Sequence, residues 1–128
     1  MNQADMLALM RRFRNAYGHA NRDELLAVTS EDFEWHQHYA NSRGEQPNGR
    51  TLYGIDELLT EIAWRKDHWS EVAYTELEER AAGEDLLVQT FVIQGLEDDE
   101  AFHAKAVDLY PVRDGRITRK DTYWKHLR

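Results

Sequence analysis

The chain has 128 residues, of which 41% are hydrophobic, so it is long enough for one domain with a packed core and too short for two. Its 16 lysines and arginines against 24 aspartates and glutamates give a net charge of −8, which argues against binding nucleic acid or anionic lipid. Cysteine is absent, which excludes disulfides and thiol catalysis. The chain has neither an apolar run of about 20 residues nor a secretory leader, so we expect a single cytoplasmic domain over residues 1–128.

Three segments have the apolar spacing of amphipathic helices. The first is predicted from about Ala4 to Gly18, where apolar residues recur every three or four positions. Asn21, followed three residues later by Glu24, predicts an N-cap and a short second helix that ends near Ser30. A third helix is predicted to begin after Gly54 and to end near Asp67, with its apolar side chains on one stripe.

The remaining segments read as strands and loops. Alternation of apolar and polar residues predicts a strand over Phe33 to His38, and the polar stretch Asn41 to Gly49 predicts a loop. Four further strands are predicted with only turns between them: Glu71 to Arg80, Leu86 to Ile93, Ala101 to Val112 and Ile117 to Trp124. The last of these turns is predicted at Asp114–Gly115, because an Asp-Gly pair tolerates positive φ angles. Strands that follow one another without crossover helices predict an antiparallel sheet with helices on one face, an α+β fold.

The strand from Ala101 to Val112 places one acid on a face of small residues. That face reads Phe102, Ala104, Ala106, Asp108 and Tyr110. Burial of a carboxyl group favours its neutral form, so Asp108 is a candidate general acid or hydrogen-bond donor. The alternative is a structural aspartate bonded to a neighbouring hydroxyl or arginine.

Three segments together carry a resemblance to a known family: Asn21 to Asp32, Gly54 to Asp56, and Val107 to Trp124. In this order and spacing they resemble the nuclear transport factor 2-like superfamily, which includes SnoaL-like polyketide cyclases, ketosteroid isomerases and limonene epoxide hydrolases. The resemblance implies a curved antiparallel sheet wrapped around N-terminal helices, a cystatin-like cone with an apolar pocket. It also implies a homodimer formed through the outer face of the sheet.

The resemblance also assigns expectations to individual positions. Asp108 falls where ketosteroid isomerases carry the acid that donates to the oxyanion. The position of their base falls on Gln37, and that of their oxyanion tyrosine on Phe13, so ketosteroid isomerase activity is not expected. Gln37 can still orient a substrate, and Tyr17, one helical turn beyond Phe13, can replace the missing hydroxyl or serve as a core aromatic.

The last strand is where the cyclases and epoxide hydrolases carry an acid. By alternation that position matches Thr122, whereas Asp121 points to the outer face, where an ion pair with an arginine is the simplest explanation. Asp121 remains a catalytic candidate if a bulge reverses the register. The arginine that the epoxide hydrolases place two residues before their strand acid corresponds here to Ala106, which argues against that reaction.

Three histidines are candidates for metal binding or acid–base chemistry. His36 and His38 lie two apart on a strand and so face the same side, where two imidazoles can bind a transition metal. A third ligand would have to come from Glu34 or another strand, and the sequence points to none, so a solvated or interfacial pair is expected and no metal. His68 follows the third helix, where a cationic histidine is favoured; it is also a candidate acid–base residue at the pocket rim.

The aromatic residues are numerous for so short a chain. Large rings in a cone favour a flat, apolar or aromatic ligand, although core packing is the commoner role. The candidate ligand-binding residues are Phe13, Tyr17, Trp35, Gln37, Tyr53, Trp64, Tyr110, Thr122 and Trp124.

Three functions follow from the sequence. The first is a cofactor-independent isomerase, cyclase, dehydratase or hydrolase acting on an apolar small molecule, with Asp108 as the acid and His68 or Asp121 as the only candidate bases. The second is a non-catalytic ligand-binding or accessory homodimer. The third is a structural dimer whose cavity is filled by side chains. Because one fold hosts many chemistries, the site must decide among them.

Overall fold

The computed structural model describes residues 1–39 and 49–127, so the loop predicted over Asn41 to Gly49 lies, apart from Gly49, outside the described residues. Within these ranges the chain forms three helices and six strands. In chain order they are α1 (Gln3–Gly18), α2 (Arg22–Val28), β1 (Thr29–His38), β2 (Arg50–Tyr53), α3 (Gly54–His68), β3 (Trp69–Ala81), β4 (Leu86–Glu97), β5 (Glu100–Arg113) and β6 (Arg116–His126).

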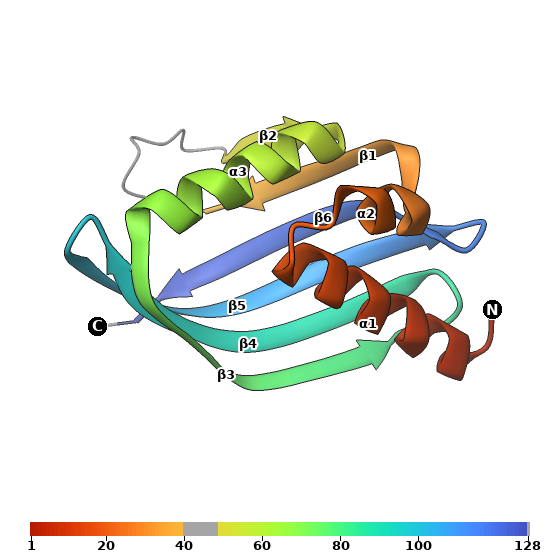
Figure 1. The fold of residues 1–128 in the computed structure, drawn as a ribbon. Coiled ribbons are helices and arrows are strands. Elements are labelled where there is room, and N and C mark those ends of the chain that lie inside the picture. Colours follow the sequence, from red (N-terminus) through yellow and green to blue (C-terminus); the bar gives the residue numbers. More distant parts are fainter. Residues whose placement is uncertain (40–48, 128) are drawn as a thin grey trace.

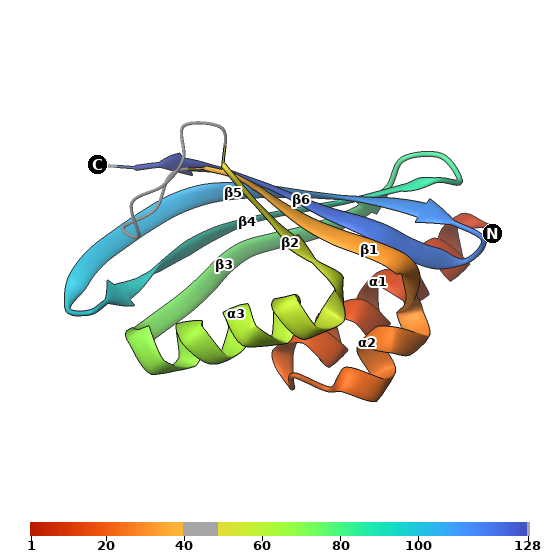
Figure 2. The ribbon, with the colours of Figure 1, turned by 90° about the horizontal axis from the view of Figure 1, so that it is seen from above.

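The strands form one curved sheet in the order β2-β1-β6-β5-β4-β3 (Figure 1). All three helices lie on the same side of this sheet, so its other side is left uncovered by helices (Figure 2). None of the helices in the described ranges is long and apolar enough to cross a membrane. The predicted α+β architecture, a sheet wrapped around helices, is confirmed.

The helix signals in the sequence correspond to physical caps. The side chain of Asn2 accepts a hydrogen bond from the backbone N–H of Asp5 at 2.8 Å, and that of Asn21 accepts from Glu24 at 3.1 Å. Each cap satisfies a backbone donor that has no partner inside its helix. The apolar faces of the helices then pack on the sheet in one large buried cluster, which includes Phe13 of α1.

The strand arrangement differs from the prediction in two respects. Strand β2 was not predicted, because a run of four residues is too short to show a periodic pattern. Strand β1 runs parallel to β6, so the sheet is mostly and not wholly antiparallel. No short turn joins these two strands, which are separated by most of the chain, so the hairpin geometry that makes neighbours antiparallel does not apply to them.

An irregularity in β6 also changes the face of one residue. Between the pairs Leu109–Asp121 and Val112–Ile117, β6 spans four positions and β5 only three. The extra residue is a bulge, which reverses the alternation on one side of it. Ile117 therefore points into the core and is fully buried, although strict alternation would place it on the outer face with Asp121.

Candidate functional site

A cavity of about 590 Å³ lies between α1, α3 and the inner face of the sheet. Rings and branched side chains form most of its wall: Phe13, Tyr17, Trp35, Ile62, Trp69, Val72, Tyr74, Phe91, Ile93, Tyr110 and Trp124. Tyr74 and Leu77 of β3 also line it and are exposed, so the cavity reaches solvent beside β3. Its volume falls in the range of pockets that enclose small organic ligands.

Asp108 lies in the wall of this cavity and is 1% exposed. Its side chain accepts three hydrogen bonds: Oδ1 accepts from the hydroxyl of Thr122, while Oδ2 accepts from Nζ of Lys120 at 2.9 Å and from the hydroxyl of Tyr110 at 3.3 Å. The sheet register produces this arrangement, because Asp108 pairs directly with Thr122 on β6. Asp108 is therefore the acceptor in each of these hydrogen bonds.

Lys120 is the main residue of the site that the sequence analysis did not select. Its side chain is only 7% exposed, and its ammonium group is bonded to Asp108 and, at 2.8 Å, to the hydroxyl of Tyr110. The same Nζ lies 5.1 Å from the ring centre of Tyr17 and 5.2 Å from that of Trp35. Desolvation by burial lowers the pKa of Lys120, and the attraction of Asp108 opposes that shift only in part.

A chain of hydrogen bonds continues from this pair toward the surface. The Tyr110 hydroxyl has one hydrogen, which Oδ2 of Asp108 shares with Oε1 of Gln89, 3.2 Å from the hydroxyl. Nε2 of Gln89 donates to Glu79 at 2.7 Å. Glu79 in turn accepts from Arg14 at 2.8 Å. Burial, followed by the negative charge of Asp108, raises the pKa of the Tyr110 hydroxyl well above its ordinary value, so this phenol stays protonated as a donor.

A second cation, Arg65 of α3, lies against the same aromatic wall. Its guanidinium carbon is 4.9 Å from the ring centre of Trp35 and 4.3 Å from that of Trp69. Nη1 donates to the hydroxyl of Tyr17 at 3.2 Å, and Nε is 3.1 Å from Oε2 of Glu61. Arginine suits this position because its planar group stacks on rings while its N–H groups donate in fixed directions. The cavity thus combines apolar walls with the positive groups of Lys120 and Arg65, and Arg14 and Lys66 also line it.

Seven of the predicted site residues line this cavity together: Asp108, Phe13, Tyr17, Trp35, Tyr110, Thr122 and Trp124. Thr122 connects two of the others, since its hydroxyl accepts from Nε1 of Trp35 at 2.9 Å and donates to Asp108. Alternation along β5 and β6 was the signal that placed four of them on one face, namely Asp108, Tyr110, Thr122 and Trp124. The inward position of the family acid at Thr122 rather than Asp121 follows the predicted register.

The other predicted residues lie elsewhere among the described residues. Gln37 is buried but does not line the cavity, and its side-chain oxygen and nitrogen find no partner in residues 1–39 and 49–127. Tyr53 is 61% exposed at the start of α3. Neither Trp64 nor His68 lines the cavity. Their rings stack on each other with centres 4.2 Å apart, and Nδ1 of His68 lies 2.8 Å from Oδ1 of Asp98.

Asp121 faces away from the cavity, on the opposite side of the sheet. It is bonded to Arg119 at 2.8 Å, as the predicted ion pair requires, and also lies 3.3 Å from Nε2 of His38. The structure thus does not bring Asp121 or His68 to Asp108. Lys120 is the ionisable partner beside it. The sequence did not single out Lys120, although its position on the same strand face as Thr122 was a signal that could have identified it.

The topology and the cavity define a nuclear transport factor 2-like α+β protein, and solved structures agree. A nuclear transport factor 2-like protein from Burkholderia xenovorans is 23% identical with a TM-score of 0.79, covering 98% of this chain and 92% of that one. A protein from Catenulispora acidiphila with a ketosteroid isomerase-like fold, in complex with trimethylamine, is 18% identical with a TM-score of 0.67, covering 91% and 85%. A provisionally assigned polyketide cyclase from Xanthomonas campestris is 17% identical with a TM-score of 0.72, covering 98% and 93%.

The family model of the SnoaL-like domain matches residues 10–120. The chain therefore belongs to the SnoaL-like domain family, as the resemblance in its sequence indicated. Among curated proteins, no sequence matches it. At identities below 25%, the solved structures establish the fold and leave the reaction to be argued from the site.

Proposed function

We propose that the protein binds a small, largely apolar molecule carrying a carbonyl oxygen and acts on it by acid–base chemistry without an organic cofactor. The observation that carries this proposal is the Lys120–Asp108 pair, 2.9 Å apart, in the wall of an aromatic cavity. A donor and an acceptor of protons lie side by side there. Lys120 can thus serve as the acid and Asp108 as the base, the two partners that acid–base catalysis needs.

The ammonium group of Lys120 has a donor to offer a ligand. Lysine carries three N–H donors, and two of these are used by Asp108 and Tyr110. Nζ lies about equally far from the rings of Tyr17 and Trp35, which line the cavity. The third N–H is therefore placed to meet a carbonyl oxygen whose apolar body rests against these rings.

The chemistry that this pair supports is the interconversion of a ketone and its enol. Lys120 gives a proton to the carbonyl oxygen, while Asp108 takes a proton from the adjacent carbon. The pair is then neutral, and the hydrogen bond between its members returns the proton from Asp108 to Lys120. Running the step backward with the proton placed on another carbon gives isomerisation, and attack of the enol on a second carbonyl gives cyclisation. Positive charge fixed beside the oxygen stabilises the developing enolate.

The second candidate is ligand binding without chemistry, and one observation favours it. Both oxygens of Asp108 are already occupied by three donors, so the carboxylate has to release one of them before it can accept a proton from carbon. If the protein only binds its ligand, the cavity holds that ligand by apolar contact and by one hydrogen bond from Lys120. The two candidates share a ligand class and differ in turnover.

We also propose that the protein forms a homodimer through the outer face of its sheet. Apolar side chains there are only half-buried in the single chain, among them Val88 and Val92 of β4 and Val107 and Leu109 of β5. The helices all lie on the other side (Figure 2). Apolar patches of this kind on a sheet commonly mark an interface.

The test of the catalytic proposal is the exchange of carbon-bound hydrogen in heavy water. 2-Tetralone is a flat aromatic ketone with acidic C–H bonds, and its deuterium uptake is followed by mass spectrometry with and without the protein. We expect the wild-type protein to accelerate exchange, and Lys120→Met and Asp108→Asn each to abolish that acceleration.

A matched control keeps the result specific. Lys125→Met makes the same substitution five residues along β6, at an exposed position, and is expected to exchange at the wild-type rate. Binding of the ketone is measured in parallel by the tryptophan fluorescence of the protein. Binding without exchange would support the second candidate, and equal loss in Lys120→Met and Lys125→Met would refute the role of Lys120.

A further inference from the structure

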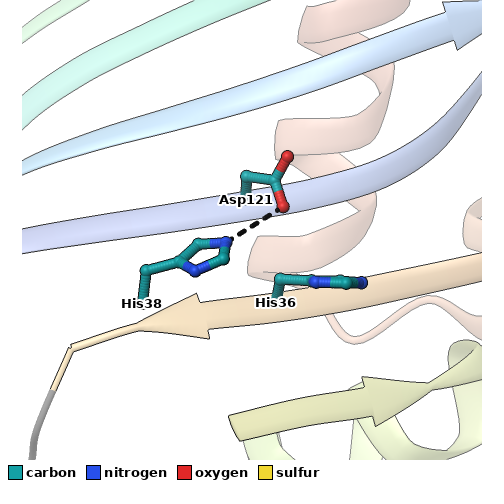
Figure 3. Close-up of side chains that lie close together, drawn as sticks. All are labelled: His36, His38 and Asp121. Atoms are coloured by element: carbon teal, nitrogen blue, oxygen red, sulfur yellow. Dashed lines mark hydrogen bonds and ion pairs between the residues drawn. The ribbon is translucent and has the colours of Figure 1, made fainter. Parts of the chain in front are cut away.

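A second cluster of polar side chains lies on the outer face of the sheet, away from the cavity. It consists of His36 and His38 of β1 and Asp121 of β6, and Figure 3 shows these three side chains close together on neighbouring strands, with the ring of His38 directed at Asp121. Alternation turns Trp35 and Gln37 inward and the two histidines outward. The parallel pairing of β1 with β6 then sets His36 directly opposite Asp121.

We propose that His36, His38 and Asp121 form a binding site for one divalent transition metal ion of the Zn²⁺ class. Each residue offers one ligand atom, and the three atoms lie within 4.8 Å of one another. In tetrahedral coordination with bonds of about 2.1 Å, neighbouring ligand atoms are about 3.4 Å apart. Nε2 of His38 and Oδ1 of Asp121 are already 3.3 Å apart.

Imidazole nitrogen and carboxylate oxygen are the ligand types that Zn²⁺ and related ions take. The sequence placed the two histidines together but gave no third ligand. Asp121 is 83 positions from His38 along the chain, and only the parallel pairing of β1 with β6 reveals it. Three protein ligands leave a fourth position open to water or to a further ligand.

Neighbouring side chains orient the three ligands. Oε2 of Glu34 lies 3.2 Å from Nε2 of His36, which leaves the other ring nitrogen for a metal. Metal-binding histidines are commonly held in this way by a carboxylate behind them. The ring of Tyr123 stacks on His38 with centres 4.4 Å apart and planes 12° apart, which restricts the rotation of that imidazole.

Charge around the site is mixed, and one residue opposes the binding of a cation. Nε of Arg119 is 2.8 Å from Oδ2 of Asp121, so it holds the carboxylate in place and leaves Oδ1 toward His38. Its positive charge also repels a metal ion. Glu34 and Asp121 together outweigh it, and the chain as a whole carries a charge of −8. Replacing Arg119 by a neutral residue should therefore strengthen metal binding.

The test uses the full chain without a histidine tag. Zn²⁺ binding is measured by calorimetry, and Co²⁺ is titrated as a spectroscopic probe whose visible absorption reports tetrahedral coordination. We expect one ion per chain. His36→Ala and His38→Ala should each weaken Zn²⁺ binding by about 100-fold or more. Residues that only hydrogen-bond to a metal ligand cost about 10- to 100-fold when they are replaced, and loss of a ligand itself should cost at least as much. Glu34→Gln should weaken it about 10-fold, and Arg119→Gln should strengthen it.

Controls separate this site from general affinity of surface histidines. His103→Ala removes an exposed histidine from the neighbouring strand β5 and should leave stoichiometry and affinity unchanged. Circular dichroism of each variant checks that it is folded. Binding that survives in the double variant His36→Ala/His38→Ala, or a wild-type Co²⁺ spectrum of octahedral type, would overturn the proposal.

Discussion

Replacing Lys120 by methionine should destabilise the fold mainly through the charge that it leaves behind. The side chain of Asp108 is 1% exposed, and a buried ion pair broken on one side typically costs 3–5 kcal/mol. We therefore expect a loss of about 3–5 kcal/mol at pH 7.

The double variant Asp108→Asn/Lys120→Met gives the sharper result. In a buried ion pair the cost of removing both charges from water largely offsets their attraction, so we expect the pair as a whole to add little to stability. Removing both charges should return the free energy of unfolding to within about 1 kcal/mol of wild type. The four proteins, measured by urea unfolding, then give a coupling energy above about 2 kcal/mol. Additive losses, or a loss below about 1 kcal/mol in Lys120→Met, would refute the buried pair.

Further predictions concern pH, an unpaired amide and the outer face. Burial holds the pKa of Lys120 below the ordinary 10.5. The protein-catalysed exchange of 2-tetralone should fall as pH rises through this pKa, because the ammonium form is the donor. A catalysed rate that rises over the same pH range would contradict this role. Since the unfolded chain binds the same proton more tightly, the contribution of Lys120 to the free energy of unfolding should rise with pH there. Unfolding curves of the wild type and of Asp108→Asn/Lys120→Met at several pH values would isolate this contribution. Gln37→Leu should gain about 1 kcal/mol in thermal unfolding, because its buried amide has no partner among the described residues; a loss would mean that the amide is satisfied. If the proposed dimer forms through the outer face, Leu109→Lys should give a monomer in light scattering where the wild type gives a dimer, without unfolding the chain. An unchanged mass would exclude this face as the interface.

Much of the fold could be predicted because its signals are local. The apolar spacing of α1, the cap at Asn21 and the Asp114–Gly115 turn each arise from neighbouring residues, and the turn has the positive φ angles, 53° and 75°, that such a pair tolerates. The inward face of β5 also followed from alternation. What failed depended on contacts between distant segments, namely the short strand β2 and the parallel pairing of β1 with β6.

In the site, too, the residues placed by local alternation could be predicted, and the contacts between strands could not. Alternation placed Asp108 and Thr122 on the cavity face, but the partner of Asp108 depends on how β5 and β6 are registered and on the length of a side chain. Lys120 shared that face, and a lysine there reads as exposed until its burial is known. For the same reason the third member of the outer cluster, Asp121, could not be found without the pairing of β1 with β6.

A crystal structure of the protein with 2-tetralone bound would decide whether Lys120 meets the carbonyl oxygen of a ligand. We expect the ketone in the cavity, with its rings against Trp35 and Tyr17 and its oxygen within hydrogen-bond distance of Nζ of Lys120. A ketone bound outside the cavity, or bound inside with its oxygen turned away from Lys120, would refute the proposed role of Lys120.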